Sequence, residues 1–93
     1  MLQKIAPNTI YSDEGFKIRF DHHYAEYTLS DNQLVRIELE WLASPHGVVF
    51  YFSTMPKFWS IPSNLAISSE ESVQIKSRIC QAAKFLGIDY EMD

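Results

Sequence analysis

The stretch QLVRIELEWL, residues 33–42, decides the fold class. Apolar and charged residues alternate along it, Val35, Ile37, Leu39 and Trp41 with Arg36, Glu38 and Glu40. A period of two residues belongs to a β-strand that has one face in the core and the other in water. We therefore expect a long strand here, whose charged face is left to solvent or to a partner.

Shorter β-like segments precede this strand. Residues 16–21, FKIRFD, show the same alternation, and residues 24–29, YAEYTL, are rich in residues that favour strands. Residues 9–12, TIYS, indicate a short first strand, joined to the next by a turn at 13–15. A second turn is expected at the polar residues 30–32.

The residues after position 42 indicate a hairpin. Residues 44–47, SPHG, break the chain, and residues 48–53, VVFYFS, predict a strand that is apolar on both faces and hence central or covered. From 54 to 66 no period is present, and two prolines exclude a central strand. The tail 87–93, GIDYEMD, alternates apolar residues with acids and predicts a short edge strand.

A single helix is expected near the C-terminal end. Ser68 and Glu71 have the spacing of a capping box, and Gly87 supplies a stop. Between them one face is apolar, with Ile75, Ile79, Ala82, Ala83 and Leu86. The pattern predicts a helix over about residues 69–86 with one buried stripe.

These elements, strands first and one helix last, predict an α+β protein. We expect an antiparallel sheet of four or five strands with the helix packed on one face. A chain of 93 residues, 46% of them hydrophobic, is enough for one ordered domain, so residues 1–93 are taken as a single domain.

Composition excludes several partner classes. The net charge is −4, and residues 1–47 alone hold four basic and seven acidic residues, which argues against a phosphate backbone and for a basic protein as partner. No segment has the profile of a signal peptide or a membrane span. With Cys80 as the one cysteine, a cytoplasmic protein without membrane contact is expected.

Catalytic and metal-binding patterns are weak. His22 and His23 are adjacent, so in a strand they would point to opposite faces, and a metal site or metal-dependent hydrolase there is the less favoured reading. Cys80 lies inside the helix, where a buried thiol is expected.

Glu38 and Glu40 lie about 7 Å apart along a strand, as paired catalytic carboxylates can, but the short chain offers no deep groove. The three glycines are all assigned to turns or caps, so no nucleotide loop is present. We expect no enzyme activity, metal or cofactor.

The segment FWSIPSNLAISSEE, residues 58–71, places two large aromatic residues in a loop. Phe58 and Trp59 could anchor a partner or close the end of the core. Because the segment joins the last long strand to the helix, we expect Trp59 and Ile61 to close the core and Phe58 to be the more exposed aromatic residue.

The order of motifs in the C-terminal half carries a family resemblance. A strand VVFYFS is followed by W-S-I-P, an I-S-x-E helix start, I-K-S-R-I along the helix and a final G-I-D-Y-E. This order resembles a family of small bacterial immunity proteins found beside polymorphic or contact-dependent toxins, single domains with a β-meander and one C-terminal helix. The resemblance implies an antitoxin that binds a cognate toxin domain and blocks its activity. None of the shared motifs identifies a toxin-binding residue in this chain.

Candidate contacts therefore come from charge and residue type. An acidic surface with aromatic residues suits a basic target such as a nuclease toxin. The candidate toxin-binding residues are Asp21, Glu26, Tyr27, Arg36, Glu38, Glu40 and Tyr51. The alternative is a small scaffold or regulatory subunit that self-associates through the C-terminal edge strand or the open sheet face, so either a monomer or a weak homodimer is expected.

Overall fold

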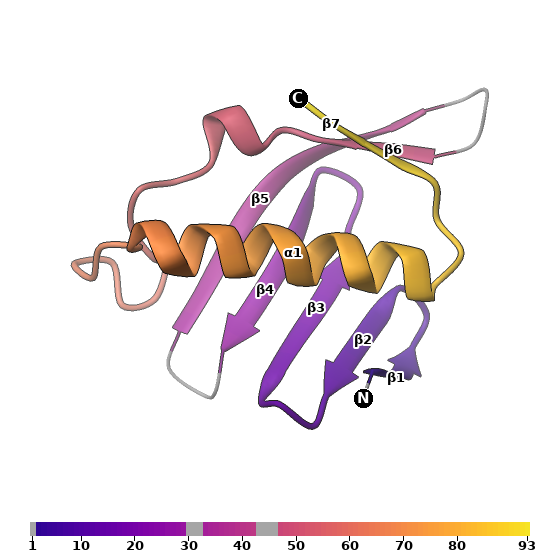
Figure 1. The fold of residues 1–93 in the computed structure, drawn as a ribbon, viewed down its shortest axis with the longest axis horizontal. Helices are drawn as coiled ribbons and strands as arrows, with labels where there is room; N and C mark the ends of the chain where they lie inside the picture. Colours follow the sequence, from indigo (N-terminus) through magenta and orange to yellow (C-terminus); the bar gives the residue numbers. More distant parts are fainter. Residues whose placement is uncertain (1, 30–32, 43–46) are drawn as a thin grey trace.

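One helix lies across one face of a sheet of seven strands in the computed structural model, which describes residues 2–29, 33–42 and 47–93 (Figure 1). The elements are β1 (Leu2–Ala6), β2 (Thr9–Ser12), β3 (Phe16–Phe20), β4 (Tyr24–Leu29), β5 (Gln33–Leu42), β6 (Gly47–Phe50), the short 3₁₀ helix η1 (Phe52–Thr54), α1 (Ser69–Phe85) and β7 (Tyr90–Met92). The turn predicted at 30–32 and the chain break predicted at 44–46 lie outside the described residues.

The strands follow one another across the sheet in sequence order, and the α+β class is confirmed. Each pair from β1–β2 to β5–β6 is antiparallel. The last pair is parallel, because α1 lies between β6 and β7 and carries the chain back across the sheet before β7 joins it. The predicted number of strands, four or five, was therefore too small. The prediction of antiparallel pairing was wrong for the last pair.

The strand β1 had no counterpart in the prediction. Its sequence LQKIA lacks alternation, and all of it except Leu2 is exposed. Pairing with β2 holds it in place, through a tight turn in which Asn8 takes a positive φ of 59°. An edge strand of this kind depends on its neighbour rather than on its own pattern.

The predicted strand at 48–53 is shorter than expected. β6 ends at Phe50, and η1 turns the chain away from the sheet towards the start of the helix. Phe52 belongs to this turn rather than to a strand, and its side chain is buried. An apolar run alone does not distinguish these two ways of burying a phenylalanine.

Helix α1 begins and ends as its sequence predicts. The Ser68 hydroxyl accepts a bond from the Glu71 backbone N–H at 3.1 Å, and the Glu71 carboxylate accepts one from the Ser68 N–H at 2.9 Å. Gly87 follows the helix with a φ of 75°, which a residue with a side chain rarely adopts. The face that packs on the sheet carries Ile75, Ile79, Ala82 and Ala83.

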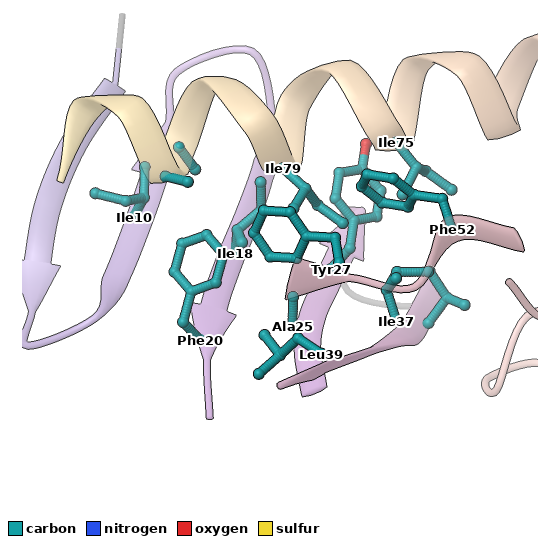
Figure 2. Packing of buried hydrophobic residues seen from close by; sticks show 14 of the residues in the cluster. Ile10, Ile18, Phe20, Ala25, Tyr27, Ile37, Leu39, Phe52, Ile75 and Ile79 are labelled. Atoms are coloured by element: carbon teal, nitrogen blue, oxygen red, sulfur yellow. The ribbon is translucent and has the colours of Figure 1, made fainter. Parts of the chain in front are cut away.

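The core lies between this helix and the inner face of the sheet (Figure 2). Trp59 enters it from the loop with 1% of its surface exposed and lies beside Tyr27, so its expected role in closing the core is confirmed. Phe58 is exposed, also as expected. Ile61 was placed wrongly: its backbone pairs with Leu34, at 2.9 Å from Leu34 N to Ile61 O, and its side chain is exposed.

Candidate functional site

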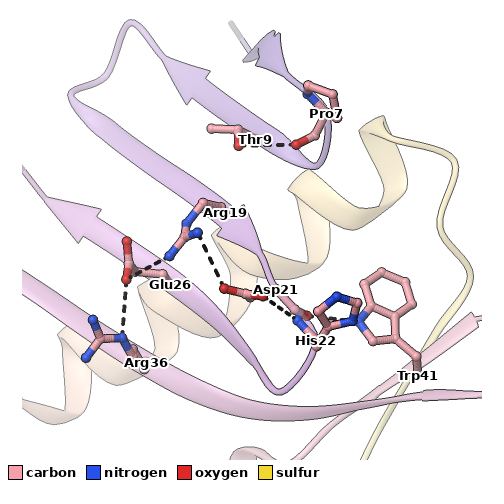
Figure 3. A network of polar contacts seen from close by, with 8 residues as sticks. All are labelled: Pro7, Thr9, Arg19, Asp21, His22, Glu26, Arg36 and Trp41. Atoms are coloured by element: carbon pink, nitrogen blue, oxygen red, sulfur yellow. Dashed lines mark hydrogen bonds and ion pairs between the residues drawn. The ribbon is translucent and has the colours of Figure 1, made fainter.

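The face of the sheet opposite α1, here called the open face, carries the charged residues of β3, β4 and β5. The strand register places Arg19, Glu26 and Arg36 side by side across these three strands. The Glu26 carboxylate lies 3.4 Å from Arg19 Nη2 and 3.2 Å from Arg36 Nε, and Arg19 Nη1 lies 3.4 Å from Asp21 Oδ2 (Figure 3). Two cations and two anions form a network of nearly zero net charge.

The network is partly shielded from water. The Glu26 side chain is 13% exposed, and the Arg36 guanidinium lies over the Tyr24 ring, 5.2 Å from its centre. A hydrogen bond from the His22 backbone N–H is the main reason why the pKa of the Asp21 carboxyl lies below its usual value. The Glu26 carboxylate is thus already satisfied within the protein, whereas the Asp21 side chain remains 31% exposed.

A second group on the open face, here called the acidic patch, consists of Glu38, Glu40, Tyr51 and Asp93. The Tyr51 hydroxyl donates to Glu40 Oε1 at 2.6 Å. That bond is the main reason why the pKa of Tyr51 is raised, and the charges of Glu38 and Asp93 add to it. Within the described ranges 2–29, 33–42 and 47–93, no ion pair joins Glu38 or Glu40 to a cation. This patch therefore presents uncompensated negative charge around a fixed aromatic ring.

The structure separates the predicted contact residues into three sets. Asp21, Glu26 and Arg36 belong to the network, and Glu38, Glu40 and Tyr51 to the acidic patch. The prediction of Tyr27 as a toxin-binding residue was wrong. Its side chain faces the helix and is 0% exposed, so it cannot contact a partner. Its hydroxyl accepts a bond from Arg78 Nη1 at 2.7 Å, and burial raises its pKa.

A pocket at one end of the sheet was not predicted. This end pocket, with a volume of about 450 Å³, is lined by Asn8, Phe20, Asp21, His22, Trp41 and Ile88. Trp41 was expected on the buried face of its strand, but it is 37% exposed, and its indole N–H donates to the Asp21 carbonyl at 2.9 Å. Its position next to the predicted chain break was the one sequence signal for such exposure.

The other candidate sites have little support in the geometry. The His22 and His23 rings are 6.5 Å apart, and no group of three metal-ligating side chains occurs in the part of the chain that the structure describes. Cys80 was expected to be buried but is only partly buried, although burial is still the main reason why the pKa of its thiol is raised. Among the described helices, none combines the length and the apolar character that crossing a membrane requires.

Comparisons with family models, with curated proteins and with solved structures each returned no match for this chain. The resemblance to immunity proteins therefore stays a prediction.

Proposed function

We propose that this protein is an immunity protein that binds a basic toxin domain through the acidic patch and blocks its activity without chemistry of its own. The observation that carries the proposal is the contrast on the open face between Glu38 and Glu40, which lack a cation among the described residues, and the neutral network beside them. A basic partner would supply the missing charges.

The patch has properties that favour protein binding. Uncompensated charge speeds the encounter with an oppositely charged partner and fixes its orientation. The hydrogen bond to Glu40 holds Tyr51 in place before binding, which lowers the entropy lost on association. Tyrosines of this kind are frequent among the residues that dominate binding energy.

The proposal is tested with the C-terminal domain of any large protein that a neighbouring reading frame encodes. Glu38→Gln/Glu40→Gln removes both charges but leaves an oxygen to accept the Tyr51 hydroxyl. We expect affinity for the toxin domain to fall roughly tenfold, about 1.4 kcal/mol, in calorimetry, and protection of growing cells to weaken.

A matched control removes the same charge elsewhere. Glu14 and Glu70 are exposed, one in the turn before β3 and the other in the first turn of α1. Glu14→Gln/Glu70→Gln should leave affinity unchanged. Equal losses in both variants would indicate a nonspecific charge effect, and no loss in either would remove the patch from consideration. Failure of every neighbouring toxin domain to bind would reject the function itself.

Self-association remains a second candidate, and the free sheet edges favour it. Strands β1 and β7 are the outer strands, each paired on one side within the described residues, and exposed edges of this kind can pair with a second copy. Sedimentation over a wide concentration range decides between the two. A monomer at all concentrations would exclude this candidate.

A further inference from the structure

We propose that the end pocket takes a lysine or arginine side chain from a loop of the partner protein, which lies over Trp41 with its charge towards Asp21. The proposal rests on the proposed function, since it names one contact of the toxin complex. It adds an anchoring site outside the acidic patch.

The pocket is built where four parts of the chain meet. The β1–β2 turn supplies Asn8, the end of β3 supplies Phe20, Asp21 and His22, and the segment after α1 supplies Ile88. Trp41 at the end of β5 closes the remaining side. A volume of about 450 Å³ is ample for one long side chain.

Trp41 offers a fixed aromatic surface in this pocket. Its N–H is satisfied by the Asp21 carbonyl, which holds the indole in one orientation, while 37% of the residue remains exposed. Cations bind over the face of tryptophan more strongly than over other aromatic rings. Tryptophan is also among the residue types enriched at the energetic centres of protein interfaces.

The charges around Trp41 favour a cationic occupant. Among the described residues that line the end pocket there is no lysine or arginine, and Asp21 is the one acidic residue. The Asp21 side chain is 31% exposed, with one carboxylate oxygen bonded to the His22 N–H and the other near Arg19 on the open face. A second hollow of about 350 Å³ also borders Trp41 and Ile88, and among its described lining residues Asp89 is the one that is charged. The acidic residues of the two hollows complement a positive side chain, and His22 is the one titratable base among their described lining residues.

The walls exist before a partner binds. A Cβ added to Gly47 would lie 2.8 Å from the Asp89 carbonyl oxygen, so only glycine allows this close approach, and Val48 N–H donates to the same oxygen at 3.0 Å. The β3–β4 turn is closed by a bond of 2.8 Å from Asp21 N–H to the Tyr24 carbonyl. A pocket with fixed walls loses little entropy when it is filled.

The pocket is also continuous with the open face. Asp21 lines the pocket and contacts Arg19 of the network at 3.4 Å, while Glu40 of the acidic patch precedes Trp41 in β5. A basic loop that crosses the end of the sheet can therefore reach both sites.

The experiment uses small probes and needs no toxin. Nα-acetyl-L-arginine amide and its lysine counterpart are titrated into the protein, with the leucine counterpart as the apolar control. NMR follows the indole N–H signals, and Trp59, which is buried, serves as an internal reference. We expect a saturable shift of the Trp41 signal with the two cations, in the millimolar range, and little with leucine. No saturable shift, or an equal response to leucine, would overturn the proposal.

Variants show whether the contacts are those proposed. Asp21→Asn keeps the backbone carbonyl that holds Trp41 and an oxygen for the His22 N–H, so the fold is expected to persist. It should weaken arginine binding roughly two- to fivefold, whereas Glu14→Gln, the same charge change at the other end of β3, should have no effect. Trp41→Leu should abolish binding. If Asp21→Asn binds as well as the parent protein, the assignment of a cation is wrong.

The two proposals fail in different ways. If the probes bind at Trp41 but no toxin domain associates, the immunity function is rejected and the cation pocket stands. If a toxin domain binds with full affinity to Trp41→Leu and Asp21→Asn, the function stands and the pocket is rejected as its contact.

Discussion

The two faces of the sheet each hold a tyrosine whose hydroxyl meets a charged side chain, yet the two contacts have different surroundings. Tyr27 lies under the helix, where its hydroxyl accepts from Arg78, whose guanidinium also lies 4.3 Å from the centre of the Phe16 ring. Tyr51 lies on the open face and donates to Glu40. The first contact satisfies polar atoms inside the core, and the second orients a ring at the surface. A residue type thus says little about its role until its face is known.

The largest expected effect distinguishes the two tryptophans. Trp59→Ala leaves a large cavity beside Tyr27 and should reduce the free energy of unfolding by roughly 3–5 kcal/mol, a large part of the total for a domain of this size. Trp41→Ala, at the partly exposed end of the sheet, should cost less than half as much. Urea denaturation followed by circular dichroism measures both. Equal costs would contradict the assignment of Trp59 to the core and Trp41 to the surface.

A second variant of Trp59 refines this result. Its indole N–H is buried without an acceptor among the described residues. Trp59→Phe therefore removes no hydrogen bond and should restore most of the stability lost in Trp59→Ala.

An intermediate effect is expected from the two hydroxyls. Tyr27→Phe leaves a partly buried guanidinium without its acceptor and should cost roughly 1.5–3 kcal/mol. Tyr51→Phe removes an exposed hydroxyl and should change stability much less than Tyr27→Phe does. The same denaturation assay compares them, and a larger loss in Tyr51→Phe would reverse the comparison.

The smallest expected effect concerns the titration of Tyr51. Its pKa is raised, chiefly by the hydrogen bond to Glu40, so the linked stabilisation is complete below the ordinary tyrosine pKa of about 10. It is lost as the pH rises through the higher pKa of the folded state. Glu40→Ala removes both the acceptor and the charge, so the pKa of Tyr51 should fall towards its ordinary value. Phenolate absorbance, with Tyr51→Phe as the reference, measures the shift, and an unchanged curve would contradict the role of Glu40.

Part of the candidate site followed from strand periodicity. Alternation in residues 33–42 placed Arg36, Glu38 and Glu40 on one face, and the structure has them there. The same rule excludes Tyr27 from that face, because it is adjacent to Glu26 in β4 and neighbours along a strand point to opposite sides. The error lay in the application of the rule rather than in the sequence signal.

The sequence by itself determined the local elements: the capping box of α1, its apolar stripe, the glycine at its end and the faces of β5. These depend on residues a few positions apart, so their physical causes are all within the segment.

Only the tertiary structure decided which charges are satisfied. The register of β3, β4 and β5 places Glu26 between Arg19 and Arg36 and leaves Glu38 and Glu40 without a cation among the described residues. The same holds for strand β1, for the parallel pairing of β7 and for the pocket beside Trp41. Each depends on contacts between segments far apart in the chain, which no local pattern specifies.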